Sequence, residues 1–275
     1  MQKRLDQFII YRYTTRMKMI LKTTDFIPAN KIQIPEIYFN RLKTGLVEVD
    51  EFLGGSEDIS GGFLRGGVYM LAAGAGTGKS TFCLQITEAL CNKGLRVAYA
   101  SGEESIEQLA FACQRLVVKN VPIAVQSDID VLCDKMGELD FIIIDSFQTL
   151  STKKHMTPRK KESYCIAKLC ARAKETKCTI VTLCHLTKAG VYKGSTAVLH
   201  GVDACINLHV DEEEPTLRLF SWSKNRFGPA DKEMAITITR KGYAWTKQKP
   251  SHTSEIVSKT SDFLNKFREH EKQSA

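Results

Sequence analysis

The stretch Gly74-Ala75-Gly76-Thr77-Gly78-Lys79-Ser80-Thr81 decides the fold of this chain. An apolar run at 68–73 precedes it, and a helical pattern of apolar residues follows it through 82–90. A strand, a glycine loop and a helix that begins with Lys and Ser form a phosphate-binding P-loop. The backbone N–H groups of such a loop and the N-terminus of its helix face an anion, and glycines allow the close approach. The sequence therefore predicts that 74–81 bind a nucleoside triphosphate.

Within the loop, Lys79 is expected to reach the β- and γ-phosphates and Ser80 to hold Mg²⁺. The general P-loop pattern begins with Gly five residues before Gly78, and Ala73 occupies that position here. We expect this extra methyl group to be tolerated, because Gly76, Gly78, Lys79 and Ser80 are all present.

Composition limits the alternatives. The chain has 275 residues, which predicts one large domain or one and a half, and 43% of them are hydrophobic, which is enough for a sizeable core. No apolar run approaches the ~20 residues that a membrane-spanning helix needs. Nine cysteines occur without a C-x-x-C pair, most of them in apolar stretches. They are interpreted as buried residues of a protein in a reducing, cytoplasmic compartment, without a metal site made of cysteines.

Apolar strands that alternate with helical patterns predict an α/β fold with a mostly parallel sheet. The expected strands are 68–73, 95–100, 123–125, 141–146 and 179–184. From about 203 onward the pattern changes to period two, at 204–210, 216–222 and 234–239. These segments are expected to extend the sheet as antiparallel strands.

Three parts of the chain are distinguished. Residues 1–40 are a basic N-terminal extension, 41–246 are expected to form the domain that holds the P-loop, and 247–275 are a polar tail with an amphipathic pattern at 253–267. The extension has three interpretations: a loosely ordered start that precedes a true initiator at Met17 or Met19, an arm that docks on a neighbouring subunit, or an organelle presequence. The sequence does not choose among them.

Candidate catalytic residues stand at the ends of the predicted strands, where ligands bind in open α/β sheets. Asp145 ends an apolar strand, as a carboxylate that holds Mg²⁺ through a water molecule beside Ser80 would. Glu103 follows the strand that ends at 100 and is the candidate general base, with Glu104 as the alternative. His185 follows the strand at 179–184, where it could sense the γ-phosphate.

Basic residues are clustered in three places. Lys224-Asn225-Arg226-Phe227-Gly228 carries two cations at the end of a strand, and a cation that reaches the γ-phosphate from outside can raise hydrolysis by roughly 10³–10⁵. The other two places are the loops after Asp145 and after His185, which we expect to line a positive groove for the backbone of nucleic acid. The residues concerned in these two loops are Lys153, Lys154, Arg159, Lys160, Lys161, Lys188 and Lys193.

The order of these motifs resembles that of the RadA family, also called Sms, of bacterial DNA-repair ATPases. The motifs are Arg41 with Thr44-Gly45, the P-loop, Ser101-Gly102-Glu103-Glu104-Ser105, 144–149, His185-Leu186-Thr187-Lys188 and 224–229. The Lys-Asn-Arg-Phe-Gly motif is the most specific of them. The resemblance covers roughly residues 41–246.

The resemblance implies a RecA-like core related to DnaB-type helicases, which uses ATP and Mg²⁺ to drive work on single-stranded or branched DNA. It also implies a hexameric ring, a recombinase as a possible partner, and a role for Lys224 and Arg226 across the subunit boundary. Glu103 becomes the favoured catalytic carboxylate. RadA proteins also carry a four-cysteine zinc module and a Lon-protease-like domain, and nothing in this sequence resembles either.

Three other functions remain open at this stage. A DnaB-type replicative helicase would translocate on forked DNA, and a recombinase-like protein would form filaments. A signalling ATPase with a RecA fold would bind protein in place of DNA.

Overall fold

The computed structural model describes residues 26–54, 61–187, 192 and 196–245. The chain divides into two units, Met1–Pro35 and Glu36–Ala275. In the first unit, the described residues form one short 3-10 turn, η2 (Ala29–Lys31). The second unit contains the strands and the α-helices described below. Within the described residues, no helix is both long and apolar enough to cross a membrane.

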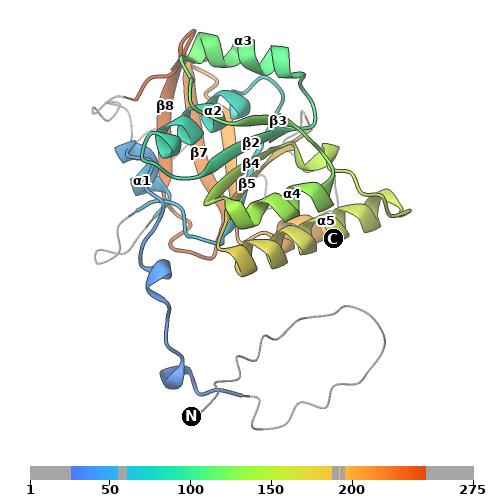
Figure 1. Cartoon of the computed structure of the whole chain (residues 1–275). Helices are drawn as coiled ribbons and strands as arrows, with labels where there is room; N and C mark the ends of the chain where they lie inside the picture. Colours follow the sequence, from blue (N-terminus) through green and yellow to red (C-terminus); the bar gives the residue numbers. More distant parts are fainter. Residues whose placement is uncertain (1–25, 55–60, 188–191, 193–195, 246–275) are drawn as a thin grey trace, which may run out of the picture. The chain divides into compact units, whose positions relative to one another are not determined.

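A nine-stranded sheet with the order β3-β2-β4-β5-β1-β6-β7-β8-β9 forms the centre of this second unit (Figure 1). Neighbouring strands from β3 to β6 are parallel, and those from β6 to β9 are antiparallel. The strands are β1 (Val68–Ala73), β2 (Val97–Ser101), β3 (Ile123–Val125), β4 (Phe141–Asp145), β5 (Thr179–His185), β6 (Ala204–Val210), β7 (Leu217–Asn225), β8 (Glu233–Thr239) and β9 (Gly242–Tyr243). The predicted α/β fold with a C-terminal antiparallel extension is confirmed.

Helices cover both faces of the parallel part of the sheet (Figure 1). One face packs against α2 and α3, and the other packs against α4, α5 and α6. The helices are α1 (Val47–Phe52), α2 (Lys79–Cys91), α3 (Ile106–Leu116), α4 (Ile129–Lys135), α5 (Pro158–Thr176) and α6 (Thr196–Gly201). Short 3-10 turns lie at η3 (Glu36–Tyr38), η4 (Met136–Glu138) and η5 (Phe147–Thr149).

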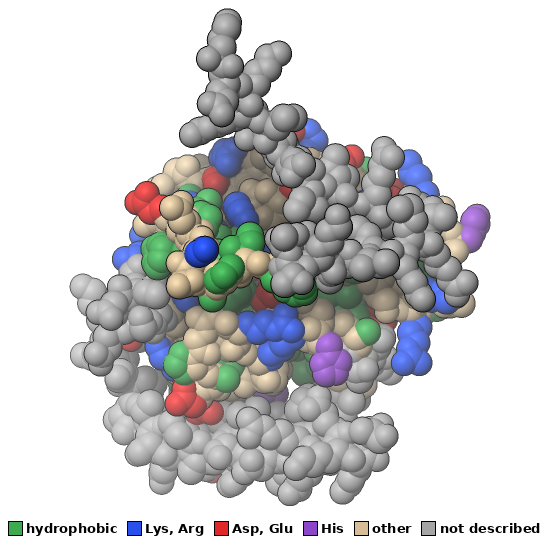
Figure 2. All heavy atoms as spheres, turned by 90° about the horizontal axis from the view of Figure 1, so that it is seen from below, with side chains coloured by type: hydrophobic (Ala, Val, Ile, Leu, Met, Phe, Trp, Pro, Cys, Tyr) green, Lys and Arg blue, Asp and Glu red, His purple; other side chains and the backbone are tan. Residues whose placement is uncertain are grey.

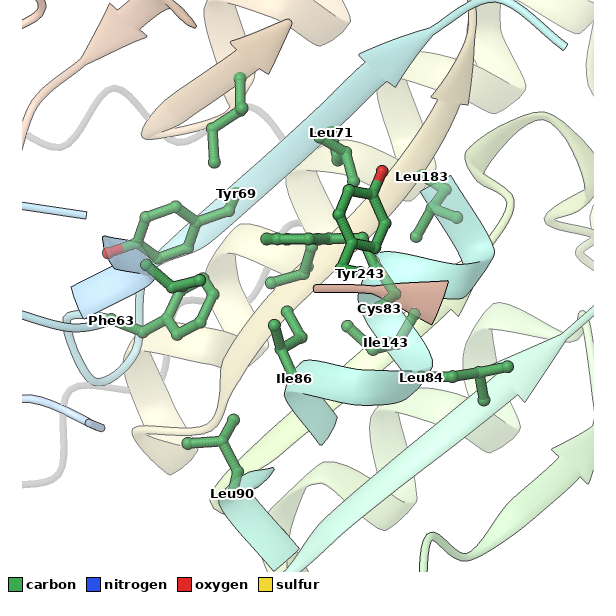
Figure 3. Packing of buried hydrophobic residues seen from close by; sticks show 14 of the residues in the cluster. Phe63, Tyr69, Leu71, Cys83, Leu84, Ile86, Leu90, Ile143, Leu183 and Tyr243 are labelled. Atoms are coloured by element: carbon green, nitrogen blue, oxygen red, sulfur yellow. The ribbon is translucent and has the colours of Figure 1, made fainter. Parts of the chain in front are cut away.

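The central strand β1 is buried at all six residues, because both of its faces are covered. Its alternate residues belong to two different cores, with Tyr69 and Leu71 on the α2 side and Val68 and Met70 on the α5 side. Figure 3 shows Tyr69 and Leu71 of β1 packed among side chains of α2 and of the neighbouring strands. This packing fixes the end of β1, and therefore the start of the P-loop.

Three expectations need correction. Helix α5 begins at Pro158, so Arg159, Lys160 and Lys161 lie in its first turn and not in a loop; Pro at the first helical position presets the helical φ angle. Strand β6 is antiparallel to β7 but parallel to β1, because the connection from β5 through α6 returns the chain to the same end of the sheet before β6 begins. Strand β5 includes His185, which was expected to follow it.

Helix α6 was not predicted at all. The expected helix at 253–267 and the basic residues 1–25 lie outside the described residues.

Candidate active site

The candidate residues meet where the parallel strands end. Strands β2, β4, β5 and β1 are consecutive neighbours and parallel, so their carboxyl ends line one edge of the sheet, which runs across the strands. The P-loop follows β1, Glu103 follows β2, and Asp145 and His185 end β4 and β5. These groups therefore lie together at the end of the sheet that the P-loop occupies.

The positions of the P-loop differ in how strictly they require glycine. Gly76 and Gly78 have φ angles of +73° and +102°, a region that residues with a Cβ rarely adopt. A Cβ on Gly78 would also lie 2.9 Å from the side chains of Ile238 and Tyr243. Ala73, in contrast, is a regular strand residue that pairs with His185 and with β6. A methyl group is therefore accommodated at position 73, as expected.

Lys79 lies over the P-loop. Its Nζ donates to the carbonyl oxygens of Ala73 at 3.1 Å and of Gly74 at 2.7 Å, and the residue is 5% exposed. Burial lowers the pKa of Lys79, and the charges of Asp145 and Glu103 act in the opposite direction. The ammonium group is thus held at the loop that would bind phosphate, as the motif predicts.

Side chains of the antiparallel strands donate hydrogen bonds to the backbone of the P-loop. Arg218 of β7 is buried, and its Nε donates to the carbonyl oxygen of Thr77 at 2.7 Å. The hydroxyl of Tyr243 in β9 donates to the carbonyl oxygen of Gly78 at 3.4 Å. Strands far along the chain therefore support the backbone of the loop.

Asp145 is 3% exposed and accepts two hydrogen bonds on its Oδ2 atom, from the hydroxyl of Ser80 at 2.8 Å and from the hydroxyl of Tyr99 at 2.5 Å. A serine hydroxyl beside a carboxylate at a P-loop is an oxygen-rich donor set, which suits Mg²⁺. Ligand atoms of Glu103, Asp145 and His185 also lie within 4.8 Å of one another. Because Mg²⁺ prefers oxygen to imidazole nitrogen, Ser80 and Asp145 are the residues that fit it.

Glu103 is held by two neighbours across the edge. Its Oε1 accepts a hydrogen bond from the hydroxyl of Ser146, and Nε2 of His185 lies 3.1 Å from Oε1 and 3.2 Å from Oε2. An ionised carboxylate only accepts, so this contact requires a proton on Nε2 of His185. The backbone N–H groups of Glu103 and Glu104 both donate to Ser101 Oγ. Burial, followed by the charges of Asp145 and Glu103, raises the pKa of Glu104.

Lys224 and Arg226 lie at the other end of the strands, the edge at which the parallel strands begin. Asn225 pairs with Ala204, which in turn pairs with Tyr69 near the start of β1. The P-loop begins five residues further along that strand, which corresponds to about 16 Å at ~3.3 Å per residue. These two cations are therefore remote from the P-loop of their own chain.

Both cations have partners within the chain. Nζ of Lys224 donates to the carbonyl oxygens of Leu199, His200 and Val202, where it caps the C-terminal end of α6. Burial, together with the charge of Arg226, lowers the pKa of Lys224. Arg226 forms an ion pair with Asp203 at 3.4 Å, and its side chain is 55% exposed.

The predicted nucleic-acid residues are only partly brought together. Lys153 and Lys154 lie in the loop between η5 and α5, and Nζ of Lys154 lies 4.3 Å from the centre of the Tyr164 ring. Arg159, Lys160 and Lys161 follow on the first turn of α5, and Lys188 and Lys193 lie outside the described residues. On the face shown in Figure 2, the visible Lys and Arg side chains are spread over the surface.

Sequence reasoning missed Tyr99, Arg218 and Ser146. Tyr99 looks like a core residue of an apolar strand, and Ser146 looks like an ordinary residue after one. Arg218 offered a signal, because it alternates with Phe220 and Trp222 and so shares the face of β7 that those two buried residues occupy. A lone cation on a buried face requires a partner.

Three comparisons place this geometry among known proteins. A family model described as an AAA domain matches residues 56–191. DNA repair protein RadA of Mycobacterium tuberculosis is 33% identical over 197 residues, which is 68% of this chain and 40% of that protein. The RadA proteins of Brucella abortus and Bacillus subtilis are 32% and 31% identical over 70% and 71% of this chain, and 42% and 43% of their own lengths.

Among solved structures, an ATPase domain resembles this chain with a TM-score of 0.62. The identity is 14%, and the match covers 76% of this chain and 93% of that domain, so it supports the fold. The chain spans about two fifths of the length of the RadA relatives that it matches.

Proposed function

Since the chain carries the core ATPase domain of the RadA family, we propose that it hydrolyses ATP to drive movement on single-stranded DNA during recombination and repair. Branched DNA is the expected substrate and branch migration the expected outcome, with a recombinase as a possible partner in the cytoplasm. The observation that carries the proposal is the cluster of Lys79, Ser80, Asp145 and Glu103 at the edge that the P-loop occupies.

The proposed chemistry assigns one task to each group. The backbone of 74–81 and the ammonium group of Lys79 bind the phosphates, and the P-loop brace formed by Arg218 and Tyr243 keeps the loop in shape. Ser80 and Asp145 would hold Mg²⁺, which would supply positive charge against the phosphates of the nucleotide.

The next step is activation of the attacking water. Glu103 accepts its proton, while the hydroxyl of Ser146 and the imidazole of His185 orient the Glu103 carboxylate. Because His185 contacts Glu103 at the end of β5, it links the general base to the segment that follows this strand. This position supports a role for His185 as a sensor of the γ-phosphate.

Lys224 and Arg226 support the proposal of an oligomer. They are remote from the P-loop of their own chain, so they can contact a nucleotide only if another subunit supplies it. A hexameric ring that closes head to tail would place one edge of each subunit against the next. In that arrangement Arg226 is the better candidate to reach the neighbouring phosphate, because its side chain is half exposed whereas Nζ of Lys224 is occupied by α6.

Binding of DNA is proposed for the basic segment between η5 and α5 together with the segment after His185. The described members of this set are Lys153, Lys154, Arg159, Lys160 and Lys161, which are exposed or partly exposed. Such a set without a base-reading element would contact phosphates, so binding is expected to weaken steeply with salt and to show little sequence preference.

The proposal is tested by measuring ATP hydrolysis with and without single-stranded DNA, with particle imaging on the same sample. We expect DNA to raise the rate several-fold and Lys79→Ala to abolish hydrolysis in both conditions. Equal rates with and without DNA would contradict the motor and favour a signalling ATPase, and images of filaments or monomers would contradict the ring.

A second comparison identifies the general base. Glu103→Gln is expected to retain nucleotide binding and lose hydrolysis, and Glu104→Gln is expected to retain most of both. The reverse result would assign the base to Glu104.

A further inference from the structure

The hydroxyl group of Tyr99 lies in an apolar core beside the carboxylate at the candidate metal site. Tyr99 is 0% exposed in the middle of β2 and belongs to the core formed with α2 and α3. Its hydroxyl donates to Asp145 Oδ2 at 2.5 Å, and Ser80 donates to the same oxygen at 2.8 Å. Two hydroxyl groups from different elements therefore converge on one oxygen of one carboxylate.

The register of the sheet explains why Tyr99 reaches Asp145. Tyr99 pairs with Ile143, and Asp145 stands two residues further along β4, on the same face as Ile143. Diagonal neighbours of this kind are ~7–8 Å apart at Cα, within reach of a long aromatic side chain. A phenylalanine would fill the same space, so packing does not account for the hydroxyl group, whereas the bond to Asp145 does.

The two carboxylate oxygens of Asp145 differ in their hydrogen bonds. Oδ2 accepts from Tyr99 and Ser80, while no hydrogen bond to Oδ1 comes from any residue that the structure describes. The contact with Ser80 also directs the hydroxyl proton of Ser80 toward Asp145, which leaves the lone pairs of that hydroxyl for a cation. Tyr99 adds a second donor that resists rotation of the carboxylate.

We propose that Tyr99 is a positioning residue for magnesium: its hydroxyl fixes the Asp145 carboxylate so that Oδ1 and the Ser80 hydroxyl are available to the ion that accompanies the nucleotide. This inference rests on the proposed ATPase site. Without the Tyr99 hydroxyl, the Asp145 carboxylate becomes ordered only when the ion binds. This ordering reduces the free energy of Mg²⁺ binding.

The test compares Tyr99→Phe with Tyr69→Phe. Tyr69 is also 0% exposed and belongs to the same core (Figure 3). Its hydroxyl accepts a hydrogen bond from the backbone N–H of Leu64 at 2.8 Å. Each substitution removes one buried hydroxyl group, but only Tyr99 contacts the candidate metal site. Binding of a fluorescent ATP analogue to the full chain is titrated with Mg²⁺ and measured separately in EDTA.

We expect Tyr99→Phe to require about tenfold more Mg²⁺ for half-maximal binding, the loss that corresponds to one hydrogen bond to a charged group. Binding in EDTA should be unchanged, and Tyr69→Phe should keep the wild-type Mg²⁺ requirement within twofold. If Tyr99→Phe does not fold, Tyr99→Met serves as a second hydroxyl-free variant, since Met fits irregular core space.

A Mg²⁺ requirement of Tyr99→Phe within twofold of wild type would overturn the inference. Asp145→Asn separates this failure from a failure of the site itself. If Asp145→Asn abolishes the Mg²⁺ dependence while Tyr99→Phe leaves it intact, only the role of Tyr99 is wrong. If wild type and Asp145→Asn respond to Mg²⁺ alike, the proposed metal site is wrong.

Discussion

Substitution of Arg218 by Met is expected to weaken both the fold and the P-loop. The guanidinium of Arg218 donates to the carbonyl oxygens of Thr77 at 2.7 Å, Pro215 at 2.6 Å and Leu217 at 3.0 Å. Water can replace the bond at Pro215, which is exposed, but less readily the one at Thr77, which is 9% exposed. Since a hydrogen bond from a charged group contributes about 1.5–3 kcal/mol, the free energy of unfolding should fall by about 2–3 kcal/mol.

In a body of ~200 residues, each kcal/mol lowers Tm by about 2–4 °C, so Arg218→Met should melt about 5–10 °C below wild type. Without the hydrogen bond from Arg218, nucleotide binding must also order the P-loop. A free-energy cost of about 1.4 kcal/mol for this ordering would weaken nucleotide binding about tenfold. Thermal melting followed by circular dichroism and titration of a fluorescent nucleotide measure the two effects.

Arg41→Met is the matched control. Arg41 also donates to backbone carbonyl oxygens, those of Leu53, Gly54, Gly62 and Phe227, but it lies toward the opposite edge of the sheet. Its loss should lower Tm by a similar amount and leave nucleotide affinity unchanged. Equal affinities of the two variants would refute the reasoning, because Arg218 would then stabilise the fold without shaping the loop.

Three further results are expected. Gly78→Ala should abolish nucleotide binding, since its methyl group would sit at a φ of +102° and 2.9 Å from side-chain atoms, while Gly74→Ala, 3.7 Å from its nearest neighbour, should bind within a few-fold of wild type in the same titration. Arg226→Ala, which removes the half-exposed cation, should retain nucleotide binding and lose hydrolysis, and mixing it with Glu103→Gln subunits should restore some activity; no recovery at any ratio would contradict a role across the subunit boundary. Burial raises the pKa of Glu233 from 4.5 to about 7, so the folded state holds this proton more tightly than the unfolded chain and stability falls as pH rises through that window. Glu233→Gln should therefore raise Tm at pH 8 and change it little at pH 4.5, and the same change at both pH values would count against this.

Local sequence patterns predicted much of the fold. The P-loop, the buried runs at 68–73 and 141–145 and the period-two strands after 203 were all located correctly. The runs at 68–73 and 141–145 are buried at every residue because both of their faces are covered, whereas burial alternates along much of β8. The resemblance to the RadA family is likewise confirmed by relatives at 30–33% identity. The start of α5 was misplaced, since the polar residues that follow Pro158 hide a helix whose apolar positions appear only later.

The amino-acid sequence by itself determined the candidate groups of this protein: which of them are expected to bind phosphate, which carboxylates stand at strand ends, and that those strands belong to one parallel sheet. Only the tertiary structure decided which groups meet. Strand order and direction place Asp145 and Glu103 beside the P-loop and Lys224 at the opposite end of the strands, and they bring Tyr99 and Arg218 into the site from positions that no motif covers. The physical reason is that a motif records chemistry along the chain, whereas contacts between side chains of different strands depend on the order and direction of those strands, and parallel neighbours are joined by long crossovers and not by a local turn.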